Sequence, residues 1–250
     1  MVYLVYDSSF GGLLTAVFEC FERKPAAVHI QKENTEVPGL FSNIISIYTD
    51  EAKALRVWKG IQNTGGKMVA LNLWKAWLSE QTGIEDVILQ YTRHLFNNKS
   101  DISGDYNHPA VLHISKVLKM IGREKHRMEA FVRFRLLGDG SYYASIEPDF
   151  DVLPLISEHF RKRYADQRWI IHDLKRNYAL SYDLVSVSTV EFTETVTVSN
   201  ELLDESERQF NGLWNAYFDS TNIKERKNTR LHMRHVPKRY WKYLTEKLDN

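Results

Sequence analysis

The chain has 250 residues, a formal net charge of +1 at pH 7 and 43% hydrophobic residues. This composition excludes a disordered protein, and the length allows a hydrophobic core that needs no disulfide or metal to stabilise it. Its single cysteine, Cys20, excludes an internal disulfide and a cysteine-held zinc or iron–sulfur site. No stretch approaches the ~18 apolar residues of a membrane-spanning helix, and residues 1–7 lack the charge pattern of a signal peptide. We therefore expect a cytoplasmic protein with no membrane association and no bound cofactor.

Apolar spacing in the N-terminal part predicts several helices and a few short strands. The strands are expected at 2–6, 26–30 and 44–48, and the helices at 13–23, 50–62, 67–79, 84–96 and 109–122. Gly65 and Gly66 separate two of these helices, and the polar segment 97–108 predicts an exposed loop. Cys20 falls on the apolar stripe of the first helix, which indicates a buried structural thiol.

The pattern changes near Met128, where alternation replaces helical spacing. Strands are expected at 131–137 and 141–146 around the hairpin signal Asp139-Gly140, and at 169–173 and 178–182, with a helix between the two pairs capped by Asp151. Further helices are expected at 204–220 and from about Pro237. The fold class is therefore α+β: a helix-rich part over 1–126 with a few strands, and an antiparallel ββαββ unit with terminal helices over 127–250. One compact domain is the alternative.

Positive charge is concentrated at residues 224–247, with nine Lys or Arg against two Glu, or +7 in a chain of +1. Cations interleaved with aromatic rings suit nucleic acid, whose phosphates attract Lys and Arg and whose bases stack. A solvated basic face, or a segment that docks on an acidic partner, is the alternative. The expected contact residues are Arg226, Arg230, Arg234, His235, Lys238, Arg239, Trp241 and Lys242, extended by Arg133, Arg135, Lys175 and Arg176.

Three alternating carboxylates, Glu147, Asp149 and Asp151, lie between an expected strand and an expected helix. Such a cluster could hold Mg²⁺ for phosphoryl chemistry. The alternative, which we favour, is that Asp151 caps the helix and Asp149 helps to form the turn. No second cluster with metal-ligand spacing accompanies it, so no metal site is expected.

His172 and Asp173 are adjacent on an expected strand that leads into Lys175 and Arg176. A histidine beside an acid could act in acid–base catalysis. However, neighbouring residues of a strand point to opposite faces, so the two cannot pair directly without a bulge. A structural histidine is the interpretation that this geometry favours, and nothing in the sequence specifies a reaction.

Several long segments together resemble a bacterial family of DNA metabolism proteins that carry a domain of unknown function. They are 6–19 (YDSSFGGLLTAVFE), 127–135 (RMEAFVRFR), 142–154 (YYASIEPDFDVLP), 160–173 (FRKRYADQRWIIHD) and 228–247 (NTRLHMRHVPKRYWKYLTEK). The resemblance implies association with a radical SAM protein in DNA modification or repair, and some members are fused to a uracil-DNA glycosylase domain. It supplies no catalytic residues.

Together these observations predict a nucleic-acid-binding accessory protein of a DNA repair or modification system. Its expected partners are DNA, single-stranded or damaged, and the radical SAM protein, and we expect no activity of its own. A DNA-processing enzyme that uses the carboxylates with His172, and a pure protein-interaction module, are the alternatives.

Overall fold

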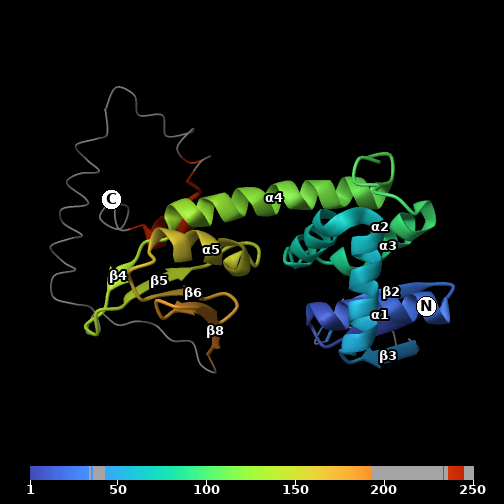
Figure 1. Cartoon of the computed structure of the whole chain (residues 1–250), viewed down its shortest axis with the longest axis horizontal. Coiled ribbons are helices and arrows are strands. Elements are labelled where there is room, and N and C mark those ends of the chain that lie inside the picture. Colours follow the sequence, from blue (N-terminus) through green and yellow to red (C-terminus); the bar gives the residue numbers. More distant parts are fainter. Residues whose placement is uncertain (34, 36–42, 193–232, 234–235, 245–250) are drawn as a thin grey trace. The chain divides into compact units, whose positions relative to one another are not determined.

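The computed structural model describes residues 1–33, 35, 43–192, 233 and 236–244 (Figure 1). The chain divides into two compact units, Met1–Gly122 and Arg123–Asn250, which are treated separately below. None of the helices in the described ranges combines the length and the apolar character that crossing a membrane requires.

Unit 1 is built on a parallel sheet of three strands in the order β2-β1-β3. The strands are β1 (Val2–Tyr6), β2 (Val28–Lys32) and β3 (Asn43–Ile47), and α1 (Phe10–Arg23) follows β1. Ser9 is the N-cap of α1, and its hydroxyl accepts a hydrogen bond from the backbone N–H of Gly12. Cys20 lies on the buried side of α1, as predicted, and burial raises the pKa of its thiol to about 11.

Three further helices complete unit 1: α2 (Glu51–Trp77), α3 (Ile84–Asn98) and the first part of α4 (Pro109–Phe131). The predicted separation of two helices at Gly65-Gly66 is confirmed, because Gly66 interrupts α2 with φ 87° and ψ 165°. This backbone conformation is essentially restricted to glycine, since a Cβ atom would clash with the neighbouring backbone.

The predicted end of the helix at 109–122 and the predicted start of the next strand are wrong. α4 continues through Phe131, because Val117, Ile121 and Met128 bury one face of it across the expected end. The strand expected at 131–137 is consequently reduced to β4 (Arg135–Leu136). Arg133 precedes this strand, and its guanidinium donates a hydrogen bond to the carbonyl oxygen of Ala130 at 2.7 Å.

Unit 2 contains a five-stranded sheet in the order β4-β5-β6-β7-β8. After β4 come β5 (Tyr142–Ile146), α5 (Leu153–Arg163), β6 (Trp169–Asp173), β7 (Tyr178–Tyr182) and β8 (Val187–Glu191). The predicted ββαββ order is confirmed, and β8 extends it. All neighbouring strands are antiparallel except β5 and β6, which are parallel because α5 connects them as a crossover.

The core of unit 2 is an aromatic layer between α5 and the sheet. Trp169 is 1% exposed, and its ring centroid lies 6.3 Å from that of Phe160 on α5 and 5.4 Å from that of Tyr182 on β7. A short 3₁₀ helix, η3 (Lys238–Tyr243), begins after Pro237, where the final helix was expected. The helix expected at 204–220 lies outside the described residues.

Substitution of Gly66 tests the break in α2. We expect Gly66→Ala to lower the free energy of unfolding by about 1–3 kcal/mol, because alanine is strained at this φ and ψ. Gly122→Ala is the matched control: a Cβ atom at Gly122 would meet no atom within 4 Å, and replacing an exposed helical glycine stabilises by roughly 0.5–1 kcal/mol. Urea unfolding followed by circular dichroism measures both, and the same sign for the two variants would contradict the assignment.

Candidate nucleic-acid interface

A hollow of about 610 Å³, lined mostly by charged residues, lies at one edge of the unit 2 sheet. Because β5 and β6 are parallel, their carboxyl ends meet at the same edge, which brings the loops that follow them together. The first loop supplies Glu147, Pro148 and Asp149, the second supplies Lys175, and η3 supplies Lys238, Arg239 and Lys242. Four cations therefore face two carboxylates.

The predicted acidic cluster and the predicted basic segment contact each other in this hollow. The Nζ of Lys242 pairs with Glu147, and a guanidinium nitrogen of Arg239 lies 2.5 Å from a carboxylate oxygen of Asp149. The hydrogen bond from Lys242 outweighs the effect of burial and lowers the pKa of Glu147. Both carboxylates are thus paired with cations of η3.

Asp151, the third member of the predicted cluster, has a different role. It does not cap α5: the residue before the helix is Val152, which makes no side-chain cap bond. Asp151 instead accepts a hydrogen bond from the hydroxyl of Tyr178 at 2.5 Å, and the register of the sheet places Tyr178 opposite Asp173 at the end of β6. Within the described ranges, no three His, Cys, Asp or Glu side chains form a group that could hold a metal ion.

Asp173 and Arg176 organise the turn between β6 and β7. Asp173 is fully buried and accepts hydrogen bonds from the backbone N–H groups of Lys175 and Arg176, at 2.9 and 3.2 Å. The Arg176 guanidinium binds the same carboxylate at 2.7 Å and donates to the carbonyl oxygen of Pro148 at 3.3 Å. Burial raises the pKa of Asp173, and Arg176 opposes this effect. The turn thereby points Lys175 toward the hollow, where its Nζ donates to the carbonyl oxygen of Asp149 at 3.0 Å.

His172 is also buried, but it does not line the hollow. Its Nδ1 lies 2.9 Å from the hydroxyl of Tyr143, and its ring centroid lies 4.4 Å from that of Phe192. Burial lowers the pKa of His172, so the neutral imidazole is favoured. As the alternation of the strand indicated, His172 and Asp173 contact different partners, and the structure brings them to no common reaction site.

The sequence interpretation missed Glu124 on α4. This side chain is buried, and its carboxylate accepts hydrogen bonds from the backbone N–H of Asp149 at 2.9 Å and from the hydroxyl of Tyr240. It also pairs with Arg127 at 3.4 Å and Arg239 at 3.6 Å. The signal in the sequence was a carboxylate in the apolar stripe of α4, where an unpaired charge would be costly.

Tyr240 fixes η3 against α4. It is 2% exposed, its ring centroid lies 5.7 Å from that of Phe131, and its hydroxyl accepts a hydrogen bond from Arg239 at 2.7 Å. The neighbouring Trp241 is half-buried, and its Nε1 donates to the carbonyl oxygen of Val236 at 3.0 Å. Lys238 is exposed, lies over the Trp241 ring at 6.0 Å, and forms no ion pair with any described residue.

Six further predicted contact residues remain, and the structure describes two of them. Arg133 and Arg135 do not line the hollow, and Arg135 lies on β4 opposite Tyr143. The other four, Arg226, Arg230, Arg234 and His235, lie outside the described residues.

Comparison with known proteins places this site within a family. The model of a domain of unknown function, DUF4130, matches residues 82–246. The chain belongs to the DUF4130 family. The matched range includes every residue that lines the hollow, as well as Glu124.

Other comparisons add nothing on fold or activity. A solved DHH domain, described as belonging to a family of ribosomal proteins, shares 9% identity, over 73% of this chain and 74% of that chain, with a TM-score of 0.29. A likeness at this level carries no argument. No curated protein matches this member of the DUF4130 family.

Removal of the Glu124 carboxylate tests its structural role. We expect Glu124→Ala to lower the free energy of unfolding by about 3 kcal/mol, because Arg239 and Tyr240 lose a buried partner. Glu158→Ala is the control, since the ion pairs of Glu158 with Arg161 and Lys162 lie on the exposed surface of α5. Urea unfolding should give an unchanged midpoint for the control; equal effects in the two variants would rule out a special role for Glu124.

The buried His172 predicts a pH dependence of stability. Its pKa is lowered from an ordinary value of 6.5, so just below that pH the unfolded state binds more protons than the folded state. The free energy of unfolding should therefore fall as the pH drops below 6.5 and be insensitive to His172 above it. His172→Gln should remove this part of the pH profile, measured by urea unfolding at a series of pH values. Parallel profiles would show that His172 is not held neutral.

Proposed function

We propose that this chain is a nucleic-acid-binding accessory protein of a DNA repair or modification system in the cytoplasm, and that it contacts phosphates at the hollow of unit 2. The observation that carries the proposal is the convergence of Lys175, Lys238, Arg239 and Lys242 on one surface, against two carboxylates. Positive charge gathered in this way attracts a polyanion. The further positive charge of residues 224–234 strengthens that attraction.

The ion pairs prepare these cations to bind phosphate. Glu147 and Asp149 hold Lys242 and Arg239 in defined positions, so the side chains lose less conformational freedom when a ligand arrives. Lys238, which is free of such a pair among the described residues, is available to a phosphate without first breaking a bond. A base that stacks on the adjacent Trp241 ring would add affinity for single strands.

The state of the carboxylates supports binding over catalysis. Glu147 and Asp149 are paired with cations and Asp151 is bound to Tyr178, so each of the three carboxylates already has a partner that catalysis would have to displace. A DNA-processing enzyme, the alternative, would require these pairs to open. The role of a radical SAM protein as the partner rests on the family resemblance of the sequence, and in this proposal that partner performs the chemistry on the bound DNA.

Substitution of Lys238 tests the proposal. Fluorescence anisotropy with labelled single-stranded and duplex oligonucleotides across a salt series should show saturable binding that weakens steeply with salt. Lys238→Ala should weaken binding for every sequence and reduce the slope of log affinity against log salt by about 1, because one phosphate contact is lost.

The control is Lys162→Ala, which removes an exposed lysine near the end of α5 that precedes β6 and therefore lies away from the hollow. It should leave both affinity and slope unchanged. No binding by the wild-type chain at low salt, or equal losses in the two variants, would reject a phosphate-binding role for the hollow.

A further inference from the structure

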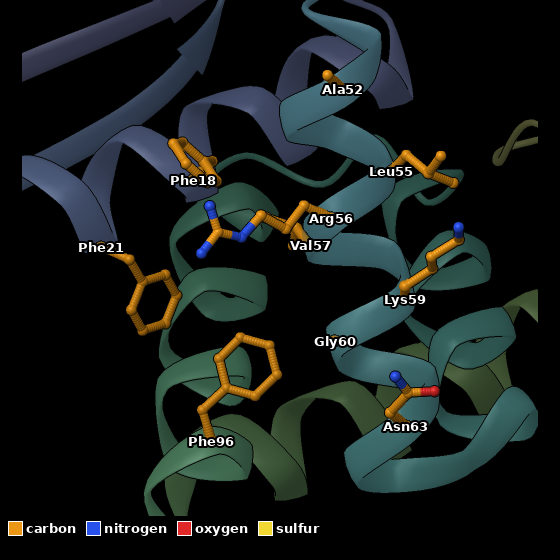
Figure 2. A pocket seen from close by; sticks show the side chains of 10 residues that line it. All are labelled: Phe18, Phe21, Ala52, Leu55, Arg56, Val57, Lys59, Gly60, Asn63 and Phe96. Carbon is orange, nitrogen blue, oxygen red and sulfur yellow. The ribbon is translucent and has the colours of Figure 1, made fainter.

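Unit 1 contains a second hollow, of different chemistry, between three helices. It has a volume of about 720 Å³ and is walled by Phe18 and Phe21 of α1, Phe96 of α3 and the exposed face of α2 (Figure 2). The rings of Phe21 and Phe96 lie 5.4 Å apart between centroids. Each of the three phenylalanines is only partly buried, so part of their apolar surface is open to the hollow.

The face of α2 that borders the hollow is a helical stripe. Residues three and four apart share a face, and the stripe consists of Ala52, Leu55, Arg56, Lys59, Gly60 and Asn63. Leu55 is 49% exposed and adds apolar surface to this face of α2. A Cβ atom at Gly60 would lie 3.2 Å from the Phe96 ring, so the glycine leaves room for that ring at the floor.

The charges around this hollow are of one sign. Among the described residues that line it, Arg56 and Lys59 are charged and none is a carboxylate. The guanidinium of Arg56 lies 5.5 Å from the centre of the Phe18 ring, and Figure 2 shows it reaching across the hollow toward that ring. Lys59 forms no ion pair with any described residue, whereas the nearby Lys53 is paired with Glu19 at 2.6 Å. An occupant that brings carboxylates beside an apolar side chain would match this arrangement.

We propose that the hollow of unit 1 docks a segment of a partner protein in which an aromatic or aliphatic side chain is flanked by carboxylates. The apolar side chain enters between Phe18, Phe21 and Phe96, and the carboxylates pair with Arg56 and Lys59. The volume is within the range of about 300–1,000 Å³ of small-molecule sites, but such sites enclose most of their ligand. Here α2 contributes exposed residues along one side, so the site suits a segment that lies across the surface. The inference does not depend on nucleic-acid binding by unit 2.

The test uses the full chain and two labelled amphipathic peptides. Both present Phe and Leu on one helical face; one has Glu at the flanking positions, and the other has Lys at the same positions. Fluorescence anisotropy should show the Glu peptide binding at least about tenfold more tightly than the Lys peptide, because opposite charges select the partner. Leu55→Glu should weaken binding of the Glu peptide by at least about tenfold, since it places a negative charge on the α2 face where the carboxylates of the peptide are expected to bind.

A charge swap separates recognition from a loss of folding. Lys59→Glu should weaken binding of the Glu peptide and strengthen binding of the Lys peptide. Unfolding of the variant cannot produce this inversion, because it would weaken binding of both peptides. Leu71→Glu, at another exposed leucine of α2 outside the hollow, and Lys238→Ala, in unit 2, should leave binding of both peptides unchanged.

Two outcomes would overturn the proposal. One is equal binding of the two peptides, or binding that is unaffected by Leu55→Glu. The other is sedimentation of the wild-type chain as a dimer that Leu55→Glu converts to a monomer, which would make a second copy of this chain the occupant in place of a partner protein.

Discussion

The buried carboxylate of Glu124 is compensated by groups from three parts of the chain, and the hollow of unit 2 depends on this compensation. Burying a charge costs several kcal/mol unless partners replace the lost water. Here the partners are the backbone of Asp149, the hydroxyl of Tyr240 and the guanidinium groups of Arg127 and Arg239. The carboxylate thus joins α4 to the loop after β5 and to η3, and the positions of the cations in the hollow follow from it.

The charge balance of the hollow follows from the same network. Arg239 bridges Glu124 and Asp149, and Lys242 pairs with Glu147, so the carboxylates neutralise part of the positive charge that the sequence concentrates at 224–247. A phosphate that binds here must compete with these carboxylates. The proposed interface would therefore hold its cations in fixed places and favour ligands whose phosphates match those places. It would bind nucleic acid less tightly than a basic cluster without ion pairs would.

The two hollows differ in the chemistry that they offer. In unit 2 four cations and two carboxylates line the hollow, whereas in unit 1 three phenylalanines form an apolar surface with cations at its border. An accessory protein that holds DNA for an enzyme needs one surface for each of them. The proposed phosphate contacts and the proposed docking site would meet these two needs with separate units of one chain.

The sequence by itself determined features that depend on near neighbours. Alternation gave β6 and β7 with their correct bounds, the glycine pair gave the break at Gly66, and the same alternation separated His172 from Asp173. Only the tertiary structure decided that Asp151 binds Tyr178 and does not cap α5, that α4 continues through Phe131, and that the acidic and basic clusters pair. The reason is physical. The periodicity of apolar residues indicates which face of a single helix or strand is buried. The pair of Lys242 and Glu147, which are 95 positions apart, depends on tertiary structure instead. It forms because parallel β5 and β6 bring their carboxyl ends to one edge of the sheet and because Glu124 fixes η3 beside that edge.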